Sequence, residues 1–220
     1  MRAEATLEWG GAILTLLPER AVWWAAERTV FIADPHFGKA AAFRFAGIPV
    51  PETSHDDDLE RLSQILTMTG AQRLVILGDF LHAKTGRSEG MFAALRAWRE
   101  KHAAVEMVLV EGNHDRHAGG LPEELRIACV KGPWALGAFR CRHEPEEDAG
   151  AYVLAGHIHP AFRLSDRMGL SVRAPCFYFS ARVGILPAFG SFTGMHGVRP
   201  VAGERVFLVG GESVIEIRGA

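Results

Sequence analysis

Cysteine is scarce in this sequence, and the pattern of its few cysteines is not typical of disulfide bonding. Only Cys129, Cys141 and Cys176 occur among 220 residues, an odd number with no CxxC pair. Such usage argues against a disulfide framework and against a zinc site built from thiolates. It favours a reducing compartment, and we expect Cys141 to be a packed thiol.

Long apolar runs are also missing, as is a strong charge of either sign. No stretch approaches the roughly 18 consecutive apolar residues that a membrane-spanning helix needs. The first residues, MRAEATLEWGG, do not form a basic segment followed by an apolar one. We therefore expect a cytoplasmic protein with no membrane association. The formal net charge of −2 argues against a uniformly basic surface but leaves room for a local basic groove.

Length and composition predict an ordinary globular protein. A chain of 220 residues that is 48% hydrophobic and 23% charged can bury a sizeable core. No repeat, low-complexity tract or linker divides the sequence, so we expect a single domain over residues 1–220.

Short apolar runs that end in polar residues recur in the first half. Residues 29–34, 73–79 and 104–113 each look like a strand buried on both faces, with polar side chains just beyond. Apolar residues at helical spacing over 56–69 and 88–101 separate these runs. Alternation of strands and helices predicts a parallel sheet with helices outside it.

Most of the other expected elements are strands. Two early strands are expected at 12–16 and 21–25, and the second half is largely β. Its expected strands cover residues 139–143, 151–157 and 176–181 and the hairpin 204–218. The fold class that follows is α/β, with two stacked mixed β-sheets flanked by helices (an αββα sandwich).

Histidine, aspartate and asparagine gather in the loops after these strands. The segments are Asp34-Pro35-His36, Gly78-Asp79, Gly112-Asn113-His114-Asp115 and Gly156-His157-Ile158-His159, with His143 between the last two. Oxygen and nitrogen donors without a thiolate suit Mn, Fe(II) or Zn in an open site that also holds water. Seven candidate ligands are too many for one ion, but two divalent ions that share one carboxylate would use them all.

The order of these motifs resembles that of the calcineurin-like metallophosphoesterase superfamily over residues 34–159. The ligand sets that the resemblance implies are Asp34, His36 and His159 for one metal and Asn113, His143 and His157 for the other, with Asp79 shared. Arg142 stands where many members have a glycine before the lone histidine. His143 is therefore the ligand that the pattern supports least.

The turn from Gly112 to Asp115 also holds the expected catalytic residues. The resemblance places His114 against the substrate phosphate or the leaving oxygen, with Asp115 orienting the His114 imidazole. Two divalent ions about 3.5–4 Å apart lower the pKa of a bridging water, which becomes the hydroxide nucleophile that attacks phosphorus.

Flanking segments resemble one branch of this superfamily more closely. FIADPHFGKAAAFRFAGIPVP (31–51), LGDFLHAKTGR (77–87), GHIHPAFRL (156–164) and LPAFGSFTG (186–194) are similar to the ligase-associated DNA damage response endonucleases, a family of phosphodiesterases. The resemblance implies manganese-dependent cleavage of DNA, with single strands preferred, in DNA repair. Fe and Zn are the alternative metals. Genes of this branch lie beside a DNA ligase and a helicase, which implies a functional association with both. His196 has no role in this pattern.

Basic and imidazole side chains near the metal motifs are the expected substrate contacts. They are Lys39, Arg44, His82 and Arg87. Phe43 and Phe45 are expected to pack in the core rather than stack on bases. Two alternatives stay open: hydrolysis of small nucleotides or other small phosphoesters, which a capped pocket would favour, and a protein-interaction platform. The second would be expected to have lost ligands, and here every ligand position is filled.

Overall fold

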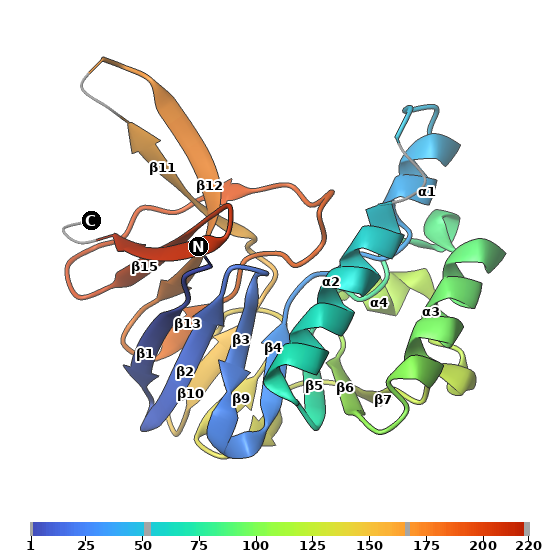
Figure 1. Ribbon diagram of the computed structural model, residues 1–220, viewed down its shortest axis with the longest axis horizontal. Helices are drawn as coiled ribbons and strands as arrows, with labels where there is room; N and C mark the ends of the chain where they lie inside the picture. The colour runs from blue at the N-terminus through green and yellow to red at the C-terminus, as the bar shows by residue number, and fades with distance from the viewer. Residues whose placement is uncertain (1, 51–53, 166–167, 218–220) are drawn as a thin grey trace.

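Two β-sheets stack face to face in the computed structural model, which describes residues 2–50, 54–165 and 168–217 (Figure 1). The first sheet has seven strands in sequence order. Its first four strands are antiparallel neighbours, and its last four pair in parallel. The strands are β1 (Ala5–Trp9), β2 (Ala12–Leu17), β3 (Ala21–Trp24), β4 (Thr29–Ile32), β5 (Arg73–Leu77), β6 (Glu106–Val110) and β7 (Ala128–Val130).

The second sheet has nine strands and is also mixed. β10 pairs in parallel with β9 and β13, whereas β12 pairs antiparallel with β11, β13 and β15. The strands are β8 (Trp134–Leu136), β9 (Phe139–Cys141), β10 (Tyr152–Ala155), β11 (Pro160–Ser165), β12 (Ser171–Phe179), β13 (Val183–Ile185), β14 (His196–Gly197), β15 (Arg205–Gly210) and β16 (Ser213–Ile217). The predicted fold class, α/β with two stacked mixed sheets, is confirmed.

Central strands of the first sheet are buried on both faces, as their continuous apolar runs predict. In β4, Phe31 lies in the cluster between the two sheets, whereas Val30 lies in the cluster beneath the helices. In β5, Val75 likewise lies between the two sheets and Leu74 lies beneath the helices. Replacing a buried Phe such as Phe31 by Ala typically costs about 3–5 kcal/mol, so this layer contributes strongly to the free energy of unfolding.

Two long helices, α2 (Ser54–Thr69) and α3 (Glu89–Lys101), cover the other face of the first sheet. The Ser88 hydroxyl caps α3 by accepting a hydrogen bond from the Met91 N–H at 3.2 Å. Trp98 Nε1–H donates to Ser63 Oγ at 3.0 Å and joins α3 to α2. The shorter elements are α1 (Lys39–Phe45), α4 (Asn113–Ala118), η1 (Ala25–Glu27), η2 (Lys84–Gly86) and η3 (Glu123–Leu125). Within the described ranges, no helix is long and apolar enough to cross a membrane.

The parallel strands are shorter than the sequence predicts at their carboxyl ends. β4 ends at Ile32, β5 at Leu77 and β6 at Val110, because the polar residues that follow turn away from the sheet. Several elements lie outside the prediction, among them helix α1 and strand β11. β11 and β12 form a hairpin that projects from the same side of the molecule as α1 (Figure 1).

Candidate active site

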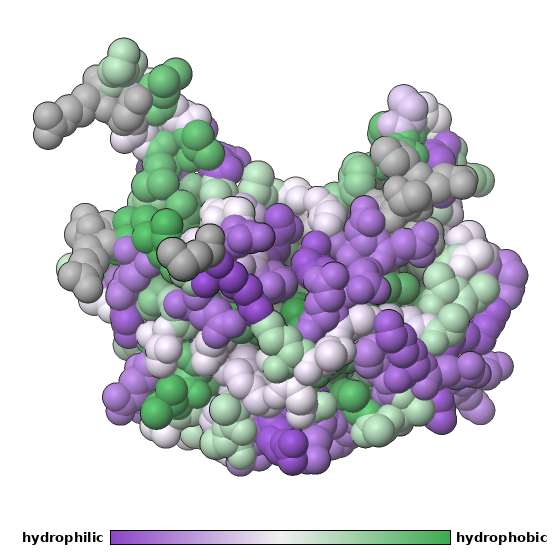
Figure 2. Space-filling view, viewed as in Figure 1, coloured by the Kyte–Doolittle hydropathy of each residue, from purple (hydrophilic) through white to green (hydrophobic). Residues whose placement is uncertain are grey.

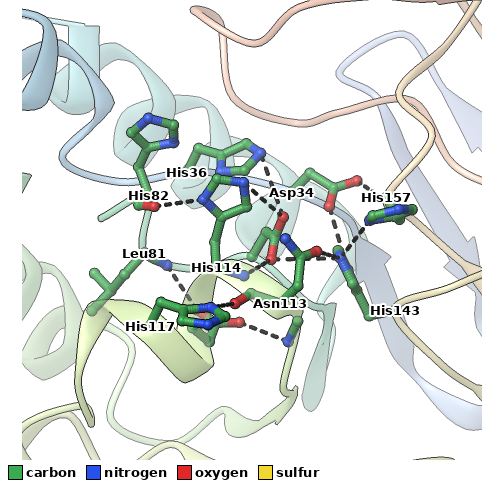
Figure 3. Close-up of polar contacts among 12 residues, drawn as sticks. Asp34, His36, Leu81, His82, Asn113, His114, His117, His143 and His157 are labelled. Carbon is green, nitrogen blue, oxygen red and sulfur yellow. Dashed lines mark hydrogen bonds and ion pairs between the residues drawn. The ribbon is translucent and has the colours of Figure 1, made fainter. Parts of the chain in front are cut away.

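All seven candidate ligands lie just beyond strand ends, where the two sheets meet. Asp34 and His36 follow β4, Asp79 follows β5, and Asn113 begins α4 after β6. From the second sheet come His143 after β9 and the pair His157 and His159 after β10. Figure 3 shows side chains from both sheets pointing toward one another. The sequence pattern thus predicted a convergence that the structure brings about.

Backbone strain is concentrated in these loops. The ligand candidates with a positive φ are Asp34 (52°), His36 (50°), Asp79 (49°), His157 (68°) and His159 (52°). Side chains of L-residues disfavour this left-handed region, at a cost of order 1–3 kcal/mol per residue, and such residues cluster at functional sites. A site that keeps five of them is held in place by the packing around it.

Glycines next to the ligands leave no room for a side chain. A Cβ on Gly78 would lie 2.1 Å from His143 Nδ1, and one on Gly112 would lie 2.2 Å from Asp79 Oδ1. A Cβ on Gly156 would lie 2.6 Å from Asp34 Oδ2. Gly78 and Gly156 therefore allow the two sheets to bring their polar groups into contact, and Gly112 allows the same between neighbouring loops of the first sheet.

One group of donors is formed by Asp79, Asn113, His143 and His157. His143 Nδ1 lies 3.1 Å from the carbonyl oxygen of Leu77, to which its N–H donates, so Nε2 carries a lone pair. That Nε2 lies 2.8 Å from Asn113 Oδ1 and 3.0 Å from His157 Nδ1. Lone pairs that face one another at such distances are stabilised by a cation between them. The donor set fits a divalent metal.

A second group consists of Asp34, His36 and His159. His36 Nε2 lies 3.4 Å from His159 Nε2, which is 3.7 Å from Asp34 Oδ2. Asp34 Oδ1 is buried and has no hydrogen-bond partner among the described residues. Burial, aided by the charge of Lys39, lowers the pKa of His36 to about 2. The ring is therefore neutral at physiological pH, which is the form that binds metals.

The carboxylate of Asp79 lies between the two groups. Its Oδ1 is 3.5 Å from His143 Nε2, and its Oδ2 is 3.8 Å from His36 Nε2. Burial raises the pKa of this carboxyl, and the nearby Asp34 carboxylate raises it further. Two carboxyl groups buried this close together favour a bound cation as the compensating charge.

His114 is held against this centre by the backbone. Its N–H donates to Asp79 Oδ1 at 2.9 Å, and its ring Nδ1 lies 2.6 Å from the carbonyl oxygen of His82 (Figure 3). The ring therefore presents Nε2 to the site, 3.9 Å from Asp79 Oδ2. The expectation that Asp115 orients this imidazole is wrong. Its carboxylate instead accepts the N–H groups of Leu81 and Gly112, each at 2.9 Å, and so fixes the turn that carries His114.

His82 packs directly against two histidines of the centre. Its ring stacks on that of His114, with centroids 5.0 Å apart, and packs edge-on against His36. Nitrogens of these three histidines lie within 4.8 Å of one another. Burial lowers the pKa of His82 to about 4. The sequence signal that could have placed it is its position three residues after Asp79.

The structure places some of the expected substrate-contact residues beside the centre and others away from it. Lys39 is half-buried and lines a pocket with His36; burial lowers the pKa of its ammonium group, while the charges of Asp79 and Asp34 act to raise it. Arg44 lines a small pocket with Lys39. Arg87 is engaged elsewhere, since its Nη1 donates to three carbonyl oxygens at the end of α4, those of residues 118–120. Phe45 is 78% exposed, so its expected core packing is wrong.

A buried carboxylate that sequence reasoning missed supports the Asp34 loop. In the sequence, Asp58 is only one of several acids that favour a helix N-terminus. It accepts hydrogen bonds from Ser191 N at 3.1 Å and Ser191 Oγ at 2.6 Å and pairs with Arg61 at 2.9 Å. The segment that it anchors donates from Gly190 N to the Asp34 carbonyl oxygen at 3.3 Å. No local signal distinguishes Asp58 from its acidic neighbours.

Fold and site together define a metallophosphoesterase: two stacked sheets with a shared carboxylate, two histidine-rich donor groups and one further histidine at their junction. Among solved structures, the nuclease MPE of Pseudomonas putida matches 97% of this chain and 100% of its own chain, with 39% sequence identity and a TM-score of 0.84. The chain belongs to the same metallophosphoesterase family as this nuclease. It is a metal-dependent phosphoric ester hydrolase with phosphodiesterase activity, and its site binds divalent metal.

Other comparisons are more distant. A protein of unknown function from Aquifex aeolicus is 17% identical, with a TM-score of 0.40 over 64% of this chain and 81% of its own. The Escherichia coli phosphoesterase YfcE is 16% identical, with a TM-score of 0.38 over 86% of this chain and 97% of its own. No protein-family model and no curated protein matches the sequence.

Proposed function

We propose that this protein is a two-metal, manganese-dependent phosphodiesterase that cleaves DNA, preferably single-stranded, in DNA repair. The observation that carries the two-metal part is the position of Asp79, whose two carboxylate oxygens each face a different donor group. Manganese fits donors that are all oxygen and imidazole nitrogen, and Fe and Zn are the alternatives. The nuclease activity of the Pseudomonas putida relative supports a nucleic-acid substrate.

In this proposal Asp34, His36 and His159 would hold one ion and Asn113, His143 and His157 the other, with Asp79 within reach of both groups. When bound, such ions activate a water for in-line attack on phosphorus and offset the charge that develops. The hydrogen bond from His143 to the Leu77 carbonyl oxygen fixes the orientation of the His143 ring, because it determines which ring nitrogen faces the centre.

His114 acts on the leaving group. When protonated, it keeps its Nδ1–H bond to the His82 carbonyl and donates its second proton, on Nε2, to the leaving oxygen as the P–O bond breaks. Proton transfer by a positioned histidine typically contributes 10²–10⁴-fold. Lys39 and Arg44, on α1 beside the centre, supply positive charge for the phosphates that flank the scissile one.

The test measures cleavage of a labelled single strand, the matched duplex and bis-p-nitrophenyl phosphate, with Mn and with EDTA. We expect Mn-dependent cutting, fastest on the single strand. His114→Ala should retain bound Mn and lose at least 100-fold in kcat, about 2.7 kcal/mol, whereas Asp79→Ala should lose the metal itself. His102→Gln, in the α2–α3 interface, is the matched control.

Hydrolysis of the small ester with DNA left intact would reject the DNA substrate and point to small nucleotides or other small phosphodiesters. Unchanged turnover in His114→Ala would reject its role at the leaving oxygen. A functional association with a DNA ligase and a helicase belongs to the same proposal and is tested by joint assays on damaged DNA.

A further inference from the structure

A groove of about 820 Å³ opens beside the β11–β12 hairpin, outside the candidate metal centre. Its polar side chains are those of Arg163, Arg173, His196 and Arg199, all of them exposed. Among the described residues, no carboxylate lines it and none forms an ion pair with these arginines. The β11 groove, defined by these four residues, is therefore a basic surface on a protein whose net charge is −2.

Two of the arginines face each other directly. Arg163 of β11 and Arg173 of β12 are paired in the antiparallel register, so their side chains project from the same face of the hairpin. Like charges in this arrangement, with Cβ atoms about 4.5–5.5 Å apart, destabilise a sheet. Arg173 Nη1 reaches the Met195 carbonyl oxygen only at 3.5 Å. An anion in the groove would relieve this repulsion.

The groove adjoins the candidate metal ligand His159. β11 begins at Pro160, and the His196 N–H donates to the His159 carbonyl oxygen at 2.9 Å. That bond joins β14 to the edge of β11, where Pro160 pairs with His196. At about 3.3 Å per strand residue, Arg163 stands about 13 Å from His159.

Apolar surface accompanies the charge. Phe162 and Met195 line the same groove, with Phe162 half-buried and Met195 44% exposed. In Figure 2 the projecting hairpin carries a band of hydrophobic residues above the more hydrophilic middle of the molecule. Positive charge with apolar surface beside it is the combination that binds single-stranded nucleic acid, through phosphates and unpaired bases respectively.

We propose that the β11 groove binds the phosphodiester backbone of a DNA single strand as it leaves the metal centre. This inference rests on the proposed function and adds the path of the substrate. Guanidinium groups pair with phosphates in a forked geometry that suits a repeating anionic backbone. A strand held at the metal centre reaches Arg163 within a few nucleotides, whereas a small ester does not extend that far.

The experiment compares Arg163→Ala/Arg173→Ala with Lys101→Ala/Arg126→Ala, which removes the same charge from exposed positions around the end of α3 and after η3. Substrates are a 20-nucleotide single strand, a dinucleotide and bis-p-nitrophenyl phosphate, each over a salt series with Mn. For the groove variant we expect KM on the 20-mer to rise at least tenfold. The slope of log affinity against log salt should fall by about 1.4, or about 0.7 for each phosphate that an arginine no longer neutralises. Turnover of the two short substrates should stay at the wild-type value.

The melting temperature of the groove variant should not fall below that of the control, because a repulsive pair has been removed. A KM on the 20-mer equal to that of the control variant would overturn the groove assignment and leave the proposed function intact. Wild-type protein that hydrolyses the bis-ester but cuts no DNA strand would overturn the proposed function and the groove assignment with it. Binding of the 20-mer that depends on Arg163 and Arg173 even in EDTA would support the groove independently of catalysis.

Discussion

Gly78→Ala isolates the role of close contact between the sheets. The new Cβ would lie 2.1 Å from His143 Nδ1, whereas real Cβ contacts below 3.0 Å are essentially absent, so the ring must move by at least 0.9 Å (3.0 − 2.1). Such a shift breaks the His143 bond to Leu77 O, now 3.1 Å, and moves Nε2 away from the donor group. A misplacement of about 1 Å can cost 10²-fold in rate.

Gly70→Ala is the matched control. Gly70 has a φ of +61° against +81° for Gly78, and a Cβ on Gly70 would meet no other atom within 4 Å. Gly70 follows α2, away from the metal centre, while both variants carry the backbone cost of roughly 1 kcal/mol for a side chain in the left-handed region. We therefore expect both variants to lose unfolding free energy through the backbone term, and Gly78→Ala to lose more because the His143 ring must also be displaced. Only Gly78→Ala should lose about 100-fold in kcat on bis-p-nitrophenyl phosphate and bind Mn more weakly by calorimetry. Equal kcat and equal Mn affinity in the two variants would refute the role of this close approach.

Two further predictions concern the body of the protein. Arg99→Met should lower the free energy of unfolding by roughly 2–4 kcal/mol in urea melts, because buried Arg99 donates to the carbonyl oxygens of Leu125, His102 and Val105; a melt like that of wild type would show that water replaces these bonds. A thiol reagent should modify one cysteine, Cys129, in the native protein and all three after unfolding, since burial raises the pKa of Cys141 and Cys176 to about 12 and only Cys129 is exposed. Rapid modification of two or more native thiols would contradict the burial.

The sequence predicts the central strands and the convergence of the ligand candidates for a common physical reason. Continuous apolar runs such as 74–77 are buried on both faces, and polar residues just after them must lie at one edge of the parallel sheet. Contacts between distant segments leave no such pattern. Asp58 looks like any acid in a first helical turn until Ser191 is placed against it. Likewise, nothing local shows that His82, rather than Asp115, contacts the His114 ring.

α1 and β11 could not be predicted because their sequences lack a periodic apolar pattern. α1 is only seven residues long, and its Phe45 is exposed, so it has no complete apolar face to reveal it. β11 changes from buried to exposed along its length, because its second half leaves the core and projects with β12. Short elements and strands that leave the core carry too little periodicity to be recognised.

Supply of the candidate metal ligands by both sheets has a consequence for the nascent chain. A ribosome-bound chain that has reached the end of α4 carries Asp34, His36, Asp79 and Asn113 but none of the three histidines of the second sheet. Completing both donor groups then requires docking of the second sheet, and bound metal stabilises the docked state by mass action. The enzyme thus acquires its hydrolytic centre only on completing its fold, and chelation should weaken the packing between the two sheets.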